Sequence, residues 1–500
     1  MKELKHFQIP CNLDLQKIII DHFGQKEGKK HLKHLPKYYY FINLLYELKS
    51  KGNYKYGLNS YINVESKQLI KVLNTKFTKK IIENLKAWGI IQVNISKETG
   101  KEIFSIEKGI PKSYRLTDAY RSSATILVAN SSERIERNDA KRVLEKTESI
   151  LSNNNLTEYK LIRYSLLKLG IDAEGAKEAL TKALEEKMPL EDKYIRVSKG
   201  KYCFYIQKKN RVFNEDSYNH YLNALLNVEN GDIGFAVCKV TNRIYSHVTN
   251  LPSFLRPFIM FQEYNLVYLD ISSSQPFFLY KLLNDYLKNV KSLEAGRERE
   301  KEGKEYNEFT FLKEELKIYG EKLQEGKLYS FLESEIKKKG IEYTGELKKE
   351  LFRNWLYCKP TTNSKTKEVI KEIFPYITNV IDHLKKDNYK DLPINLTKME
   401  SRAVINHICK RICQEVHDPF VITIHDGIIT TSEQVDEIYN IMLEELTAFV
   451  GIKPHIKVEL LAEAKVIQLV PEVLQATNPW NIQAPKLQPT EKTFFMFRAA

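Results

Sequence analysis

The sequence has no uninterrupted apolar run long enough to span a bilayer, and its first residues lack the apolar segment of a signal peptide. Cysteine is scarce, with six residues scattered along the chain and no paired framework, which fits a reducing compartment. Cys409 and Cys413 stand four positions apart, but no second Cys/His pair has ligand spacing, which favours buried thiols over a metal site. These absences predict a cytoplasmic protein without membrane contact.

Positive charge is plentiful. The 500 residues carry a net charge of +14, and an excess of this size favours a polyanionic partner, with nucleic acid ahead of a membrane surface. The alternative is a surface covered by solvated lysines. The length predicts two to four domains and enough apolar material for a substantial core.

Shifts in composition divide the chain into five segments. We predict a basic arm over residues 1–30, a DNA-binding domain over 31–120 and a helical, thumb-like connector over 121–205. A catalytic body is predicted over 206–470. Pro, Gln, Thr and Asn predict an extended tail over 471–500.

The pattern of residues 31–120 is helix, helix, a third helix with lysines on its outer face, then a basic hairpin. The third helix covers residues 75–88, leaves Lys79 and Lys80 outward, and ends at Gly89. This order resembles a winged helix-turn-helix domain, in which the third helix enters a major groove and the hairpin tip contacts phosphate. The alternative is a helical domain whose lysines are only solvated.

Two distant β-branched runs each end in an aspartate. The first is Leu266-Val267-Tyr268-Leu269-Asp270 and the second is Val421-Ile422-Thr423-Ile424-His425-Asp426, which is followed by Gly427. Taken alone, either aspartate could be a turn former. As a pair carried by strands, they predict the two carboxylates of a two-metal phosphoryl-transfer site.

Four blocks between residues 238 and 430 carry a resemblance when they are read together. They are Thr241-Asn242-Arg243-Ile244-Tyr245 with Asn250-Leu251-Pro252, Asp270 with Gln275, Lys349 with Tyr357, and His425-Asp426. In this order they resemble motifs of the family A DNA polymerases and of their relatives, the single-subunit RNA polymerases of phage and mitochondria. The resemblance covers about residues 200–465.

The family resemblance implies an α+β right-hand polymerase with palm, fingers and thumb, an antiparallel palm sheet, and two Mg²⁺ ions, for which Mn²⁺ could substitute. It implies that the Ile271 carbonyl joins Asp270 and Asp426 as a metal ligand. Lys349 would neutralise phosphate charge, while Gln275, Tyr357 and Arg353 would contact the nucleotide. The residues expected near primer and template are Thr241, Arg243, Arg256, His425 and Glu400, with Lys79 and Lys80 on the N-terminal domain.

The sequence also departs from the family pattern. Gly345 stands where the second motif has its Arg, Cys358 replaces the Gly after the Tyr, and Gly427 replaces a Glu or Ser. Asn242 replaces the Gly of the first block, whereas both carboxylates are intact. The helix that carries Lys349 is the least secure assignment, and Lys348 or Arg353 could share its role.

These motifs favour a DNA-dependent DNA polymerase that replicates a phage, plasmid or other mobile element in a bacterial cytoplasm or an infected host cell. Its partners would be a DNA template with a primer or promoter, together with nucleoside triphosphates. A single-subunit RNA polymerase or primase-like enzyme is the first alternative. In the family, a Glu at the position of Gln275 would indicate whether deoxyribose or ribose is used, and that Glu is absent here. The second alternative is a non-catalytic DNA-binding replication initiator.

Overall fold

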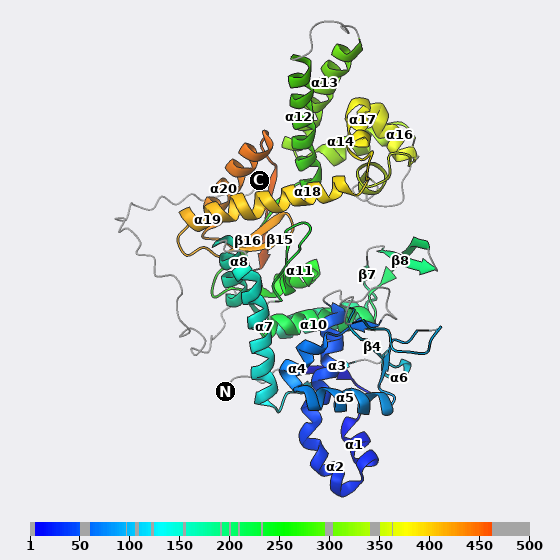
Figure 1. The fold of residues 1–500 in the computed structure, drawn as a ribbon. Helices are drawn as coiled ribbons and strands as arrows, with labels where there is room; N and C mark the ends of the chain where they lie inside the picture. Colours follow the sequence, from blue (N-terminus) through cyan, green and yellow to red (C-terminus); the bar gives the residue numbers. More distant parts are fainter. Residues whose placement is uncertain are drawn as a thin grey trace, which may run out of the picture. The chain divides into compact units, whose positions relative to one another are not determined.

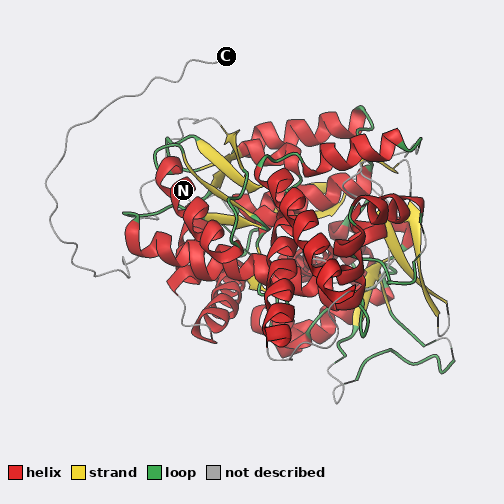
Figure 2. Ribbon diagram, turned by 90° about the horizontal axis from the view of Figure 1, so that it is seen from above, coloured by secondary structure: helices red, strands yellow, loops and turns green. Residues whose placement is uncertain are grey.

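A computed structural model describes residues 6–50, 61–96, 98–105, 110–121, 125–153, 157–190, 193–199, 202–208, 211–231, 234–295, 304–340, 351–362 and 364–462. Helices dominate it, and every pairing between its named strands is antiparallel (Figure 2). The α+β class predicted from the sequence is therefore confirmed. The predicted tail over residues 471–500 lies outside the described residues.

The first described residues are folded into the N-terminal region. Strand β1 (His6–Pro10) pairs with β5 (Thr125–Ala129), and helices α1 (Leu15–Phe23) and α2 (Gln25–His31) follow, with a short 3-10 helix η1 (Leu32–His34). Phe7, Ile9 and Ile19 are buried in the N-terminal core. Residues 6–30 therefore differ from the predicted basic arm, because this segment buries apolar side chains between its charged positions.

The next segment consists of three helices and a small sheet. Its elements are α3 (Leu35–Ser50), β2 (Ile62–Asn63), α4 (Ser66–Leu73), α5 (Thr75–Ala87), β3 (Ile91–Val93) and β4 (Ser113–Leu116), and the strand order is β2-β4-β3. Asn74 caps α5 by accepting a hydrogen bond from the Phe77 N–H at 3.1 Å. The helix buries Ile81 and Leu85 and leaves Lys79 and Lys80 exposed, as its apolar spacing predicts.

The middle of the chain combines helices with short strands. Its elements are α6 (Asp118–Arg121), α7 (Glu133–Asn153), α8 (Thr157–Lys168), β6 (Gly170–Ile171), α9 (Ala173–Glu185), β7 (Pro189–Leu190), β8 (Lys193–Lys199), β9 (Tyr202–Lys208), β10 (Arg211–Val212) and α10 (Glu215–Glu229). Strands β8 and β9 form an antiparallel hairpin. Alternating aromatic and β-branched residues account for these strands.

A buried polar network joins α10 to the N-terminal region. The Gln8 side-chain amide donates to the Asn219 carbonyl at 3.2 Å, and Asn223 donates to Gln8 at 3.1 Å. The Gln8 backbone N–H donates to the Asn43 side chain at 2.9 Å. Because buried amides must be hydrogen-bonded, these contacts fix how β1, α3 and α10 pack.

The four-stranded sheet β15-β16-β14-β17 lies within the larger core. Its strands are β14 (Leu266–Ile271), β15 (Ile422–Ile424), β16 (Gly427–Thr431) and β17 (Ile456–Ala462). Shorter elements precede it, namely β11 (Ala236–Val237), β12 (Ile244–Tyr245), α11 (His247–Asn250), the 3-10 helix η2 (Ser253–Phe258) and β13 (Ile259–Met260). The β-branched runs that predicted strands at Asp270 and before Asp426 form β14 and β15.

The other elements of this part of the chain are helices. They are α12 (Ser274–Ala295), α13 (Lys304–Gln324), α14 (Leu328–Lys338), α16 (Lys365–Ile373), α17 (Pro375–Leu384), α18 (Asp391–Ser401), α19 (Lys410–Glu415) and α20 (Val435–Val450), with π-helical segments η3 (Phe352–Leu356) and η4 (Arg402–Cys409). Figure 1 shows α18 and α19 in one long continuous helix through η4. No helix in the described part of the chain combines the length and apolar character that a bilayer crossing needs.

Candidate active site

The sheet register brings the two predicted carboxylates to the same end of adjacent strands. Asp270 on β14 is the register partner of Gly427 on β16, and Asp426 directly precedes Gly427 in the turn from β15. Register partners and chain neighbours are separated by fixed Cα distances, so the Cα atoms of the two aspartates lie within about 10 Å of each other. The hairpin register brings together two residues that are far apart in the sequence.

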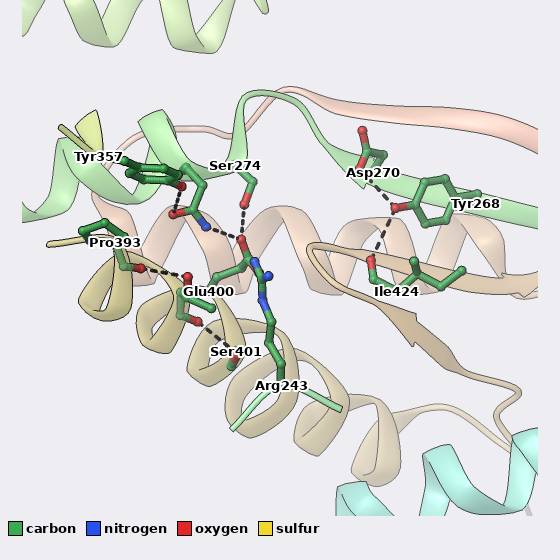
Figure 3. A network of polar contacts seen from close by, with 11 residues as sticks. Arg243, Tyr268, Asp270, Ser274, Tyr357, Pro393, Glu400, Ser401 and Ile424 are labelled. Carbon is green, nitrogen blue, oxygen red and sulfur yellow. Dashed lines mark hydrogen bonds and ion pairs between the residues drawn. The ribbon is translucent and has the colours of Figure 1, made fainter. Parts of the chain in front are cut away.

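The Tyr268 hydroxyl lies close enough to both carboxylates for their charges to act on it. It donates to Asp270 Oδ1 at 3.2 Å and lies 3.4 Å from the Ile424 carbonyl oxygen (Figure 3). Burial raises the pKa of Tyr268 far above its ordinary range, and the negative charges of Asp270 and Asp426 raise it further. One phenol therefore senses both aspartates and remains protonated at neutral pH.

Two basic residues, Arg256 and His425, stand at the same end of the sheet. Arg256 donates from Nε to the Leu251 carbonyl at 3.2 Å. Burial lowers the pKa of the Arg256 guanidinium, while electrostatic interaction with Tyr268 and Asp270 opposes that shift. His425 has a positive φ of 55°, which few side chains adopt readily. Burial of its ring and repulsion by Arg243 and Arg256 lower the pKa of His425 to about 4, although part of the residue is exposed. The imidazole is therefore neutral at pH 7.

The lowered pKa of His425 predicts a pH dependence of stability. Between about pH 4 and 6.5 the unfolded chain binds a proton at this residue that the folded chain does not. The contribution of His425 to the free energy of unfolding should therefore be complete above pH 6.5 and should decrease as the pH falls towards 4. Thermal unfolding across this range should show a larger loss for wild type than for His425→Asn, in which asparagine tolerates the positive φ. Equal losses would assign the effect to other groups.

The glycine after Asp426 makes room for the Tyr268 ring. A Cβ atom at Gly427 would lie 2.5 Å from Cε2, Cζ and the hydroxyl oxygen of Tyr268, well inside van der Waals contact. We expect Gly427→Ala to lower the free energy of unfolding by about 1–3 kcal/mol through overpacking. In a double-mutant cycle measured by denaturant unfolding, Tyr268→Ala should remove most of this cost; additive effects would show that the ring is not the obstacle.

A second polar cluster is centred on Glu400 of α18, whose side chain is fully buried (Figure 3). Arg243 donates to its Oε1 from Nε at 2.9 Å and also from Nη2. Ser274 and Gln275, at the start of α12, donate to Oε2 at 2.9 and 2.7 Å. One carboxylate thus ties together three segments that are far apart in the sequence, and its charge is balanced by Arg243.

Tyr357 extends this cluster. Its hydroxyl donates to Gln275 Oε1 at 3.3 Å, and burial together with the Glu400 charge raises the pKa of Tyr357 to about 12. The Gln275 amide is therefore oriented from both ends, because its nitrogen donates to Glu400 while its oxygen accepts from Tyr357. The structure thus brings together four predicted site residues, Arg243, Gln275, Tyr357 and Glu400.

Three further residues near the site were not identified from the sequence. Tyr268 could have been found, because it lies two positions before Asp270 and so on the same face of the strand. Tyr329 on α14 has its pKa raised by burial and by the charges of Tyr357 and Asp426. The fully buried Lys385 donates to the Trp355 carbonyl at 2.7 Å and supports the segment that leads to Tyr357. No local pattern marks the last two residues.

The remaining predicted residues lie elsewhere or are not described. Thr241 lies in the turn between β11 and β12, where its buried hydroxyl has no hydrogen-bond partner within the described part of the chain. Ile271 is buried in β14 opposite Ile456. Lys349 falls outside the described residues, as does Lys348, and for Arg353 only the backbone, within η3, is described. Lys79 and Lys80 lie on α5 and belong to a separate, N-terminal surface.

The residues at the sheet end fit a magnesium site. Mg²⁺ is held by one or two carboxylates and otherwise by waters, carbonyls and substrate phosphates. Asp270 and Asp426 supply two hard oxygen donors whose charges both reach the Tyr268 hydroxyl. Within the described residues, no larger group of His, Cys, Asp and Glu side chains is placed to hold a metal ion. This donor set suits Mg²⁺ or Mn²⁺ better than zinc, for which nitrogen and sulfur ligands are usual.

No protein-family model matches the chain, and no curated protein matches it in sequence. Among solved structures, the chain is similar to the polymerase domain of Pol1 from M. smegmatis, whose structure is a complex with DNA primer-template and dNTP. The TM-score is 0.36 at 12% sequence identity, and the match covers 65% of this chain and 73% of that one. A similarity of this size does not establish a common fold, so any function must be argued from the residues of the site.

Proposed function

We propose that this protein is a template-directed nucleotidyltransferase, a DNA-dependent DNA polymerase that uses two divalent metal ions. The observation that carries the proposal is the placement of Asp270 and Asp426 at one end of adjacent antiparallel strands. Arg243 and Arg256 lie close enough to lower the pKa of His425, the residue directly before Asp426. Paired carboxylates beside cationic side chains suit chemistry on polyphosphate.

The roles follow from the chemistry of each group. Asp270 and Asp426, with the Ile271 carbonyl, would hold Mg²⁺, which would activate a 3′-hydroxyl and stabilise charge on the departing pyrophosphate. Tyr268 keeps Asp270 in a fixed orientation through its hydroxyl hydrogen bond. The neutral imidazole of His425 can accept or donate one hydrogen bond without adding charge beside the arginines. Lys349 would neutralise the triphosphate.

The Glu400 cluster would form the nucleotide side of the site. The Tyr357 hydroxyl lies 3.3 Å from Gln275 Oε1, and Gln275 is bonded directly to Glu400, so Tyr357 is tied to Glu400 through Gln275. We assign to them contacts with the sugar and base of the incoming nucleotide, and Arg353 would join them. Arg243, which is partly exposed beside Glu400, would reach the primer or template backbone together with Thr241 and Arg256.

The N-terminal region would bind DNA outside the catalytic body. The order α3, β2, α4, α5, β3 and β4, with the sheet order β2-β4-β3, supports a winged helix-turn-helix arrangement with α5 as the recognition helix. The exposed lysines of α5, Lys76, Lys79, Lys80 and Lys86, would face the duplex. A site-binding domain joined to a polymerase fits replication of a phage, plasmid or other mobile element.

A primer-extension assay tests the proposal. The protein would be incubated with Mg²⁺, primed or unprimed template, and either deoxyribonucleotides or ribonucleotides. Template-dependent extension of the primer with deoxyribonucleotides is the expected result. Incorporation of ribonucleotides alone would instead indicate the RNA polymerase or primase-like alternative. The absence of incorporation in every arm, with Mg²⁺ or Mn²⁺, would contradict the proposal.

One observation favours a second candidate, a non-catalytic DNA-binding replication initiator. The Tyr268 hydroxyl occupies a place beside Asp270 where a metal or water could otherwise bind. If this phenol blocks metal binding, then Tyr268→Phe should raise Mn²⁺ affinity, measured by the electron paramagnetic resonance signal of free Mn²⁺, and wild type should bind none. Binding of Mn²⁺ by wild type that is lost in Asp426→Asn would favour the polymerase.

A further inference from the structure

A small cavity lies in the N-terminal region, away from the carboxylate site. It is enclosed by the start of α3, the end of α4 with the turn into α5, and the start of α7, and its volume is about 90 Å³. Helices α4 and α7 lie side by side here (Figure 1). Its lining includes the buried side chains Val72, Leu73 and Ile135 and the cationic residues Lys37, Lys71 and Arg134.

The cationic residues that line the cavity are only partly neutralised by acidic side chains of the protein. Lys71 pairs with Glu145 at 2.6 Å, but among the described residues no carboxylate pairs with Lys37 or Arg134. The Lys37 ammonium lies 3.1 Å from the centre of the Phe77 ring, which fixes its position at the cavity. Burial lowers the pKa of Lys37, and repulsion by Arg134 lowers it further, so the charge of Lys37 is disfavoured where it stands.

The surroundings of the cavity are cationic as well. Burial lowers the pKa of His34 to about 4, and the charges of Lys37, Lys33 and Lys80 act in the same direction. Glu133 and Glu136 flank Arg134 in α7, and neither forms an ion pair with it among the described residues. An anion in this cavity would relieve repulsion between lysines and an arginine that are otherwise held close together.

The size and position of the cavity select the kind of anion. At about 90 Å³ it has room for a phosphate group with a few waters, whereas pockets for whole small-molecule ligands start at roughly 300 Å³. Leu73 and Asn74, at the turn that leads into α5, line the cavity, and α5 carries the exposed lysines Lys76, Lys79 and Lys80. The cavity therefore lies near the N-terminal end of the helix that is proposed to contact DNA.

We propose that this cavity is a phosphate site that holds one backbone phosphate of duplex DNA between Lys37 and Arg134. The proposal rests on the proposed DNA binding by the N-terminal region and adds a fixed anchoring point to it. Phosphate contacts set the position of a protein on the duplex without reading the sequence. The site would thus set where α5 meets the groove.

Salt dependence of DNA affinity tests this proposal. The full-length protein would be titrated onto a fluorescent duplex of about 30 base pairs at several salt concentrations, and log K would be plotted against log[salt]. The variants are Lys37→Gln, Arg134→Gln and their double variant. The matched control is Arg137→Gln, which removes the same charge from an exposed position of α7 that does not line the cavity.

If Lys37 and Arg134 share one phosphate, the slope of log K against log[salt] should be smaller in magnitude by about 0.9 for the double variant than for wild type. Two separate phosphate contacts would reduce it by twice that value. Its affinity near 0.1 M salt should fall roughly tenfold, while Arg137→Gln should stay within about twofold of wild type. Melting curves would check that every variant is folded. A double variant that matches the Arg137→Gln control in slope and affinity would overturn the phosphate site and leave DNA binding by the N-terminal region intact.

Two other outcomes would also overturn the inference. Wild type that fails to bind duplex DNA at all would remove both the phosphate site and the proposed DNA-binding function of this region. If inorganic phosphate is the only occupant, it should raise the melting temperature of wild type but not of Arg134→Gln, while the DNA affinities of the two proteins should be equal. That result would assign the cavity to a free anion.

Discussion

Primer extension by Asp270→Asn or Asp426→Asn protein is expected to fall by about 10³-fold or more. Loss of one carboxylate removes a negatively charged oxygen ligand, and the charge stabilisation supplied by a bound metal is worth several kcal/mol in the transition state. The folded structure should persist, because Asn matches Asp in shape and, in Asp270→Asn, the amide oxygen can still accept the hydrogen bond from the Tyr268 hydroxyl. Single-nucleotide incorporation under saturating Mg²⁺ would measure the effect.

The control is Asp436→Asn, which removes one negative charge from the exposed first turn of α20. It should keep activity within about twofold and cost at most about 1 kcal/mol through the helix dipole. Both active-site variants should bind duplex DNA as tightly as wild type, because the N-terminal region is unchanged. Full extension activity in either one would contradict the assignment of the two carboxylates as metal ligands.

Glu400→Ala is expected to lower the free energy of unfolding by about 3–5 kcal/mol. The substitution removes the common acceptor for Arg243, Ser274 and Gln275, and leaves a partly buried guanidinium and two polar groups without their partner. It should also raise the KM for nucleotide, because Gln275 and Tyr357 lose the group that orients them. Urea unfolding and steady-state extension kinetics would measure the two effects.

A surface ion pair provides the comparison. Asp285→Ala breaks the exposed Lys281–Asp285 pair, which joins at 3.1 Å, and should cost less than about 1 kcal/mol. Glu400→Gln keeps the volume of the side chain, and its cost in free energy of unfolding should lie between the costs of Asp285→Ala and Glu400→Ala. Combining Arg243→Met with Glu400→Leu should restore part of the stability, since both charges are then absent. A Glu400→Ala cost no larger than that of Asp285→Ala would show that the cluster contributes little to stability.

Local pattern was enough to locate the strands of the candidate site. The β-branched runs before Asp270 and Asp426 predicted β14 and β15, because such residues favour a buried pleated strand and an aspartate with glycine favours the turn that follows. The lysine face of α5 also followed from the spacing of Ile81 and Leu85. By contrast, the composition of residues 1–30 suggested an arm, because single apolar residues such as Phe7 show no regular spacing in the sequence. Their place in a core follows only from the pairing of β1 with β5.

The sequence by itself determined which residues end the strands, which face of α5 is charged, and that the chain is α+β, since these features depend on neighbours a few positions apart. Only the tertiary structure decided that Asp270 lies opposite Gly427, that Glu400 binds Arg243 and Gln275, and that the charge of Arg134 acts on Lys37. The physical reason is that burial changes the energy of a polar group according to what surrounds it in space. For Glu400, those surroundings include Arg243, which is 157 positions away in the sequence.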